Sequence, residues 1–354
     1  MKKALRIIGV ILCALLLLVV VFFGVLTLTE YKPQAVEDVR VDGTGKKALS
    51  PGDSLTVLSW NIGYGALGDN ADFFMDGGKG VRTADRARVD QNLSGIASAI
   101  EGFAPDICLM QEVDIHSDRS WHVDEAERLS SAMPGAASAF AQNYLSLYVP
   151  FPVPPIGHVD GGIVTLSSFS VREAQRVSLP CPFSWPIRLG QLKRCLLVTR
   201  IPLEGTDKEL VAVNLHLEAY DDGEGKAAQT RQLAQFLRDE ADKGNYVIAG
   251  GDFNQVFSTV DMTRYPTYEG MWLPGKVETE AFGDDFTLLM DDKTPSCRSL
   301  DRPYAGADRE TFQYYVIDGY IVSQNVRVET VQTQQMDFTF TDHNPVMLKV
   351  TLEP

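Results

Sequence analysis

Six short polar motifs, each at the end of an apolar run, are spread over residues 55–352 of this 354-residue chain. In five of them a carboxylate, carboxamide or imidazole lies at or just beyond the end of a predicted strand. Side chains at strand ends can converge on one rim of a sheet sandwich, where binding groups often gather. These groups are therefore expected to meet although they are distant in sequence. The motifs are Leu58-Ser59-Trp60-Asn61, Met110-Gln111-Glu112-Val113, Val213-Asn214-Leu215-His216-Leu217, Gly250-Gly251-Asp252-Phe253-Asn254, Val316-Ile317-Asp318-Gly319-Tyr320 and Thr341-Asp342-His343-Asn344-Pro345.

The hydrophobic pattern between the motifs predicts many strands and few helices. Apolar residues at helical spacing predict helices over residues 83–102, 124–133 and 227–241, the second with Asp124 as its N-cap. Short apolar or β-rich runs predict strands at 55–60, 107–111, 210–217, 246–249, 314–322, 327–332 and 345–351. Many strands with few helices between them are typical of an α+β domain built from two packed sheets.

The first thirty residues differ from the rest of the chain. Residues 1–6 are basic, and residues 7–29 form an uncharged apolar run of 23 residues. As a helix this run spans roughly 35 Å, enough to cross a hydrocarbon core of about 30 Å. The charges of Lys2, Lys3 and Arg6 predict a cytoplasmic N-terminus and an extracytoplasmic remainder. We therefore expect a single-pass cell-membrane protein, with a transmembrane anchor at 7–29, a linker at 30–53 and one domain at 54–354.

A cleaved signal peptide is the alternative for the N-terminal segment. Signal peptides usually have a shorter apolar region, about 7–15 residues, followed by a small-residue cleavage site. The run in this chain ends in Leu26-Thr27-Leu28-Thr29-Glu30, which offers no such site. The sequence therefore favours an uncleaved anchor.

Charge and cysteine content limit the partners of the domain. Without residues 1–30 the chain has 29 basic and 46 acidic residues, a balance of −17. Such a surface repels phosphate backbones at long range and argues against general nucleic-acid binding. No cysteine pair has metal-ligand spacing. A Cys181–Cys195 disulfide is permitted by the expected location, but the sequence leaves it open.

Together and in this order, the six motifs resemble those of the endonuclease/exonuclease/phosphatase superfamily, the DNase I-like metal-dependent phosphoesterases. The resemblance covers residues 55–352. It implies a four-layer α/β sandwich, with two packed mixed β-sheets flanked by helices, after the N-terminal transmembrane helix. It also implies hydrolysis of a phosphodiester or phosphomonoester by an activated water.

The resemblance assigns a metal site to Asn61, Glu112 and Asp342. In isolation Asn61 fits a turn cap and Glu112 a solvated strand end. Both supply oxygen ligands suited to Mg²⁺ or Mn²⁺. In the family arrangement Glu112 is the principal ligand, Asn61 assists it, and Asp342 lies near the metal.

The resemblance also assigns the catalytic residues. His216 contacts the phosphate, Asp252 orients or deprotonates the attacking water, and Asn254 binds the scissile phosphate. Asp318 partners His343, whose imidazole polarises water or a phosphate oxygen near neutral pH. In isolation His216 fits a core histidine, and Asp252 with Asn254 fits a Gly–Asp turn. Asp318 fits a strand-end carboxylate, and Asp342 with His343 fits a solvated turn. We expect His216 and His343 to face one pocket with Asp252 between them.

Several points stay open at the level of sequence. Family members often carry Ser-Arg before an aromatic residue and Pro, whereas this chain has Ser167-Ser168-Phe169-Ser170, so the arginine is missing. His158 and Asp160 either line the site or form a Gly-rich turn. The anchor and the acidic surface favour a phospholipid headgroup or an inositol phosphate as the substrate. We expect the protein to be a monomer. An extracellular nuclease of the same fold and a catalytically inactive binding module are the alternatives.

Overall fold

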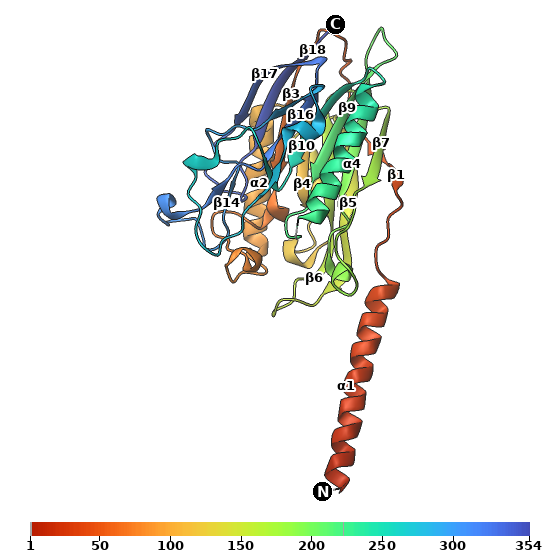
Figure 1. The fold of residues 1–354 in the computed structure, drawn as a ribbon, viewed down its shortest axis with the longest axis vertical. Helices are drawn as coiled ribbons and strands as arrows, with labels where there is room; N and C mark the ends of the chain where they lie inside the picture. Colours follow the sequence, from red (N-terminus) through yellow and green to blue (C-terminus); the bar gives the residue numbers. More distant parts are fainter. Residues whose placement is uncertain (1, 222) are drawn as a thin grey trace.

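The computed structural model describes residues 2–221 and 223–354, and its main body is a pair of seven-stranded mixed sheets (Figure 1). In spatial order, the first sheet contains β17 (Val326–Thr333), β18 (Val346–Leu352), β3 (Ser54–Asn61), β4 (Ile107–Asp114), β6 (Gly157–Ser167), β5 (Ala137–Val149) and β2 (Val41–Asp42). The second contains β1 (Val36–Val39), β7 (Glu173–Ser178), β8 (Cys195–Pro202), β9 (Glu209–His216), β10 (Tyr246–Asp252), β16 (Asp318–Ser323) and β13 (Phe286–Leu289). Two small ladders join β11 (Gln255–Phe257) to β12 (Gly275–Val277) and β14 (Cys297–Arg298) to β15 (Tyr314–Tyr315).

The central core lies between the two sheets. Leu55 and Leu109 of the first sheet pack in one cluster with Ala212, Ile248 and Tyr320 of the second. Strands β9 and β10 are buried along their whole length. Strands covered on both faces carry nearly continuous apolar runs, which explains why these segments are so apolar in the sequence.

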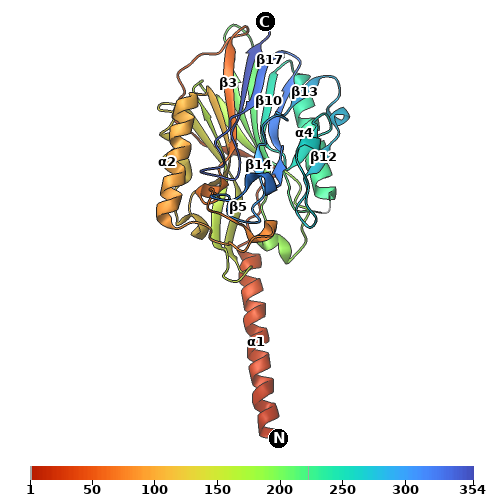
Figure 2. The same cartoon turned by 90° about the vertical axis from the view of Figure 1, so that its left-hand side faces the viewer.

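Helices cover the outer face of each sheet. Helix α2 (Arg86–Phe103) buries Leu93 and Ile96 in a cluster with Trp60 and Met110 of the first sheet. Helix α4 (Glu224–Ala241) buries Leu233 against the second sheet. The two helices lie on opposite sides of the sheet pair (Figure 2). The predicted four-layer α/β sandwich is thus confirmed.

The helix ends follow their capping residues. Helix α2 begins at Arg86, three residues later than predicted, because the side chain of Asp85 accepts a hydrogen bond from the backbone N–H of Arg88. Helix α3 (Glu125–Ser130) begins after Asp124, whose side chain accepts from the N–H of Glu127. The predicted role of Asp124 as an N-cap is confirmed.

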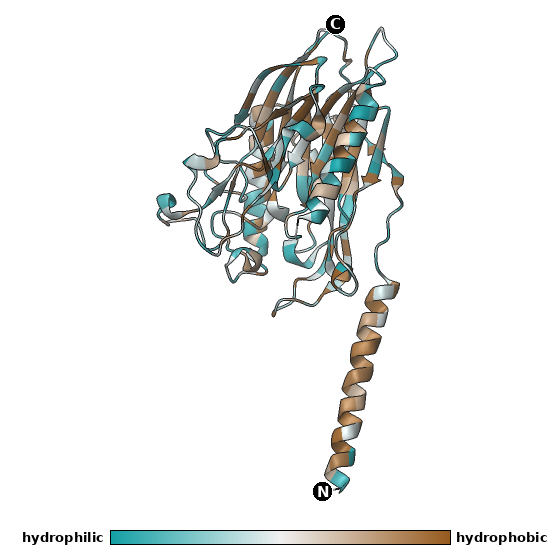
Figure 3. Cartoon of the chain, in the orientation of Figure 1, coloured by the Kyte–Doolittle hydropathy of each residue, from teal (hydrophilic) through white to brown (hydrophobic). Residues whose placement is uncertain are grey.

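Helix α1 (Lys2–Leu28) extends away from the sandwich and is apolar over nearly all its length (Figure 3). It is long and apolar enough to cross a membrane. The segment expected to be a linker, residues 30–53, differs from that expectation because it contains β1 and β2. Val36 pairs with Val177 of β7, and Val41 pairs with Ala139 of β5. Strands of four and two residues are too short to give a periodic hydrophobic pattern in the sequence. They are recognised only by their pairing with β7 and β5 in the structure.

Candidate active site

Four strands of the sandwich end or begin at the same rim, and each carries one of the predicted residues there. Asn61 ends β3, His216 ends β9 and Asp252 ends β10. Asp318 begins β16, which runs antiparallel to β10, so the two aspartates are register partners. Asp252 is also the register partner of His216 across the parallel β9–β10 pair. Strand pairing therefore gathers His216, Asp252 and Asp318, and the packing of the two sheets adds Asn61.

The carboxylate of Asp252 lies at the centre of this group. Its Oδ2 is 3.0 Å from Nδ2 of Asn61, 3.5 Å from Nε2 of His216 and 3.9 Å from Nε2 of His343. Nδ1 of His343 lies 2.8 Å from Oδ2 of Asp318. The structure thus places both histidines in one pocket with Asp252 between them.

The backbone directs Glu112 and Asn254 into the site. Glu112 has a φ of 53° and lies at a register shift between β4 and β6, where the bulge turns its side chain out of the ladder. Asn254 has a φ of 50°, donates its backbone N–H to Oδ1 of Asp252 and donates Nδ2–H to the carbonyl of Leu217. Left-handed backbone costs a non-glycine residue about 1 kcal/mol or more, and such strain is concentrated at functional sites.

The loop that carries Asp342 and His343 is held from several sides. The indole N–H of Trp60 donates to the carbonyl of His343, and the N–H of Arg298 donates to the carbonyl of Asp342. The side-chain amide of Asn344 donates to the carbonyl of Pro295. These contacts orient the histidine toward Asp252 although no regular element carries it.

The two histidines have opposite electrostatic environments. Burial, assisted by the charge of Arg194, lowers the pKa of His216 well below its usual value. Burial by itself would also lower the pKa of His343, but the acidic groups around it, first the carboxylate of Asp318 and then Asp342 among others, together raise that pKa well above the usual value. Near neutral pH the site therefore offers one neutral imidazole and one imidazolium.

The carboxylates of the site are held in an unfavourable environment for their charged forms. Burial and then the charge of Asp318 raise the pKa of Asp252 to about 7. Burial and then the charge of Asp342 raise the pKa of Glu112. Buried carboxylates that repel one another are stabilised by a cation bound between them. The donor set thus fits a divalent cation.

The orientation of the Asn61 side chain differs from that of a metal ligand. Its Nδ2 donates to Glu112 and Asp252, at 3.2 and 3.0 Å, and its Oδ1 accepts from the N–H of Gly63. In this structure Asn61 therefore presents a donor rather than an oxygen ligand. Within the described residues, two groups bring three ligand atoms within 4.8 Å of one another: Cys297 with Asp342 and His343, and Asp252 with Asp318 and His343.

Arg119 is a further functional candidate, which lies outside the six motifs. Its guanidinium forms a bidentate ion pair with Asp114, at 2.9 Å for both bonds, and lies 3.8 Å from the ring centroid of Tyr64. Its charge counteracts the rise in the pKa of Glu112. The five-residue spacing between Asp114 and Arg119 is the only local signal for this pair.

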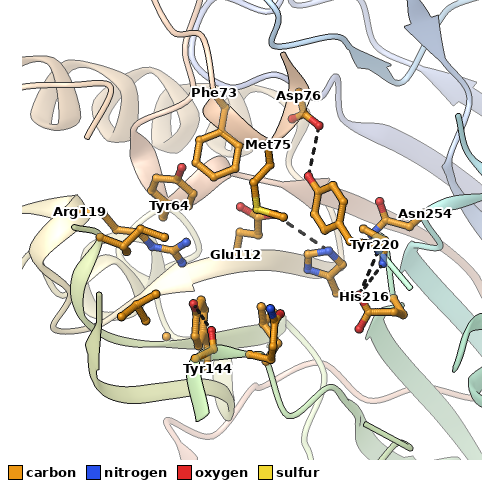
Figure 4. Close-up of a pocket in the computed structure, with 18 of the residues that line it drawn as sticks. Tyr64, Phe73, Met75, Asp76, Glu112, Arg119, Tyr144, His216, Tyr220 and Asn254 are labelled. Carbon is orange, nitrogen blue, oxygen red and sulfur yellow. Dashed lines mark hydrogen bonds and ion pairs between the residues drawn. The ribbon is translucent and has the colours of Figure 1, made fainter. Parts of the chain in front are cut away.

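A cavity of about 810 Å³ holds these groups (Figure 4). Glu112, His216, Asp252, Asn254, Asp342 and His343 line it, whereas Asn61 and Asp318 lie behind its wall. Tyr220 and Asp76, which the sequence did not single out, meet across the cavity through a hydrogen bond of 3.3 Å.

The residues left open by the sequence lie outside this cavity. The ring of His158 packs near His116, with centroids 6.0 Å apart, and the carboxylate of Asp160 accepts from the side-chain amide of Gln142. Both therefore have structural contacts that explain them without a place in the pocket wall. Cys181 is exposed and Cys195 is buried, and both are free thiols in this structure.

Comparisons with known proteins agree with this geometry. Residues 58–343 match the family described as "Endonuclease/Exonuclease/phosphatase family". No curated protein sequence matches the chain. Among solved structures, the endonuclease/exonuclease/phosphatase from Beutenbergia cavernae has a TM-score of 0.57 at 19% identity, over 85% of this chain and 72% of its own.

Two further solved structures share the fold. ANGEL2, a 2′,3′-cyclic phosphatase solved with adenosine-2′,3′-vanadate, has a TM-score of 0.54 at 12% identity, over 89% of this chain and 99% of its own. The catalytic domain of human Nocturnin, solved with a bound sulfate, has a TM-score of 0.51 at 15% identity, over 88% and 97%. At these identities the likeness is one of fold.

Proposed function

Because this chain belongs to the endonuclease/exonuclease/phosphatase family and is a phosphoric ester hydrolase, we propose that it is a metal-dependent phosphoesterase tethered to a membrane by α1. In this proposal residues 1–6 are cytoplasmic, residues 7–29 cross the membrane, and the catalytic domain, which includes β1 and β2 as well as residues 54–354, lies outside it. The substrate is a phosphodiester or phosphomonoester.

One observation carries the mechanism: Oδ2 of Asp252 lies within 4 Å of Nε2 of both His216 and His343. Their surroundings lower the pKa of His216 and raise that of His343, which favours a neutral His216 and a cationic His343. Asp252 accepts the proton of the attacking water. His343, held by Asp318, donates to a phosphoryl or leaving-group oxygen. Nε2–H of His216 and the amide of Asn254 bind the other phosphate oxygens. Donors on several oxygens stabilise the charge of the transition state.

The reaction is a simple hydrolysis in which atoms and charges balance. The water oxygen forms a bond to phosphorus, the ester P–O bond breaks, and the leaving oxygen takes up a proton. Glu112, with Asp342 and Asn61, would hold Mg²⁺ or Mn²⁺, which when bound polarises a phosphoryl oxygen as a Lewis acid. Asn61 would take part as a ligand if its amide were turned to present Oδ1.

A nuclease of the same fold is the second candidate, because the ANGEL2 structure contains an adenosine vanadate in this fold. The balance of −17 outside the anchor opposes it, since an acidic domain repels polynucleotides. An inactive binding module is disfavoured because the candidate catalytic groups all lie together at one rim. A phospholipid headgroup or an inositol phosphate is therefore the preferred substrate.

The test is hydrolysis by the full-length protein purified in detergent. Bis(4-nitrophenyl) phosphate and 4-nitrophenyl phosphate report diesterase and monoesterase activity, and a panel of phospholipids, inositol phosphates and oligonucleotides follows. We expect turnover that needs Mg²⁺ or Mn²⁺ and is lost in Glu112→Gln. Full turnover by chelated protein, or none on any ester with either metal, would overturn the proposal.

A further inference from the structure

The cavity that contains the catalytic candidates also reaches the end of the N-terminal helix. Phe23 and Leu26 of α1 line the same cavity as Glu112, His216 and His343. A hydrolase acting on a small water-soluble phosphoester has no need for such continuity. The cavity therefore connects the reacting groups with the place where the chain would leave a membrane.

The wall between these two ends is largely apolar. Phe74 of η2 (Phe74–Asp76) and Phe151 have ring centroids 5.9 Å apart, and Val149, Ile156 and Ile187 also line the cavity. Glu112, His216, Asp252, Asp342 and His343 supply the charged and polar groups of the catalytic end. Such a division matches a ligand that has a polar head and an apolar body.

The outer rim of the cavity exposes large apolar side chains beside α1. Phe151 is 67% exposed, Val153 is 92% exposed and Ile187 is 59% exposed. Leu147 and Trp185 are exposed as well. Soluble surfaces seldom gather such residues unless the patch meets a partner or a membrane. We call residues 147–153 and 185–187 the apolar rim.

Contacts with α1 fix the position of the apolar rim along the axis of that helix. The indole N–H of Trp185 donates to Oγ1 of Thr27 at 3.0 Å, and its ring centroid lies 5.9 Å from that of Phe23. The ring of Tyr148 lies 6.3 Å from that of Phe22. Tryptophan and tyrosine are enriched where a membrane meets water. The rim thus lies at the level where α1 would leave the bilayer.

A salt-bridge cluster joins the end of α1 to the domain. Glu30 pairs with Arg188 at 3.1 Å and with Lys193 at 3.3 Å, and Leu26 is buried. These ion pairs follow α1 directly and join it to the loop that carries Trp185. The apolar rim would therefore stay against the bilayer.

We propose that the cavity binds an amphiphilic phosphoester taken directly from the bilayer, such as a phospholipid. Its phosphate lies between His216 and His343, its hydrocarbon chain lies along the apolar wall, and it enters through the apolar rim. The inference rests on the proposed hydrolase function and adds the substrate class and the route of entry.

The first experiment uses 4-nitrophenyl alkyl phosphates with methyl, butyl, octyl and dodecyl chains and the full-length protein in nanodiscs. All four esters release nitrophenolate, so the chemical step is the same. We expect kcat/KM to rise with chain length, by up to about fourfold per buried methylene. Ile187→Asn and Phe151→Ser should flatten this dependence, because they should lower kcat/KM for the octyl and dodecyl esters more than for the methyl ester.

Leu273→Asn is the matched control, because Leu273 is 57% exposed and lies outside the cavity wall. Partition of the esters into the nanodisc is the same for all variants. A change in the dependence of kcat/KM on chain length that occurs only in the rim variants therefore reports binding in the cavity. Absence of hydrolysis of all four esters, together with none of the esters in the first panel, would overturn the proposed function. Hydrolysis with no chain-length dependence, or with equal slopes in all variants, would overturn only this inference.

A second experiment tests entry from the bilayer without relying on turnover. Brominated phospholipids in the nanodisc quench tryptophans that contact the acyl chains, and the chain has four tryptophans. We expect quenching that is largely lost in Trp185→Phe. Equal quenching in the two proteins would show that Trp185 does not contact the bilayer and would contradict the proposed route.

Discussion

Nδ1 of His343 and Oδ2 of Asp318 lie 2.8 Å apart, and both side chains are buried. The other oxygen of Asp318 has no hydrogen-bond partner within the described residues. The aspartate therefore acts mainly on the histidine, and the hydroxyl of Ser296, which accepts from the N–H of Asp318, helps to place it. Several expected outcomes follow from this pair and its surroundings.

Asp318→Asn should lower the pH above which activity is lost. Burial lowers the pKa of His343, and the carboxylate of Asp318 is the strongest of the neighbouring groups that together raise it. Without that charge the imidazolium loses its proton at lower pH, so the alkaline limb of the kcat profile moves to lower pH and kcat at pH 8 falls. Rates from pH 5 to 10 check this. An unmoved alkaline limb would show that His343 is not the group that titrates.

His343→Ala should lower kcat by roughly 10² or more, the range for a lost general acid–base group. It should also destabilise the fold, by about 3 kcal/mol, because Asp318 becomes an unpaired buried carboxylate. The double variant His343→Ala/Asp318→Asn should regain stability but not activity. Denaturant unfolding and turnover measured on the three proteins separate the two effects, and recovery of turnover in the double variant would refute the catalytic role.

Metal affinity should fall as the pH drops. The pKa of Asp252 is raised to about 7 by burial and by Asp318, and that of Glu112 is raised by burial and by Asp342. A cation needs the charged carboxylates, so protons compete with it below about pH 7. For one competing proton, the Kd for Mn²⁺ should rise about tenfold from pH 8 to pH 6. Calorimetric titration checks this, and a pH-independent Kd would contradict it.

Arg119→Gln should weaken metal binding more than Arg119→Lys does. The charge of Arg119 favours the ionised form of Glu112, and lysine retains a charge but not the bidentate pair with Asp114. Loss of a supporting residue of this kind typically costs about 10–100-fold in metal affinity. The Kd for Mn²⁺ is the measurement. Similar affinities in the two variants would show that charge at this position is unimportant.

Protease added to intact cells or spheroplasts should digest the catalytic domain. The basic residues before α1 predict a cytoplasmic N-terminus and an external domain. Immunoblotting against the domain, with a cytoplasmic protein as the control for membrane integrity, follows the digestion. Full protection of the domain while the control stays intact would refute this topology.

Much of the architecture was predictable because it depends on local pattern. The period of Leu93 and Ile96 predicts α2, and the side chain of Asp124 predicts the start of α3. The four layers came from the family resemblance rather than from periodicity. The edge strands β1 and β2 were missed, because strands this short are stabilised by their partners and not by their own sequence.

The candidate site also has a part that the sequence predicts and a part that only the structure shows. His216, Asp252 and Asp318 were identified from their motifs and the family resemblance, although Asp318 fell inside the predicted strand 314–322. The contacts of Arg119 with Tyr64, and of Tyr220 with Asp76, join segments that no local pattern relates. The extension of the cavity to Phe23 and Leu26 of α1 likewise could not be predicted from local sequence.

The sequence by itself determined which polar groups stand at strand ends and that a long apolar helix precedes them. Only the tertiary structure decided which atoms meet and in which charge state. The register of β10 between β9 and β16 brings His216, Asp252 and Asp318 together. Burial and neighbouring charges then make one histidine neutral and the other cationic. A pKa depends on desolvation and on charges nearby in space, and neither is a property of local sequence.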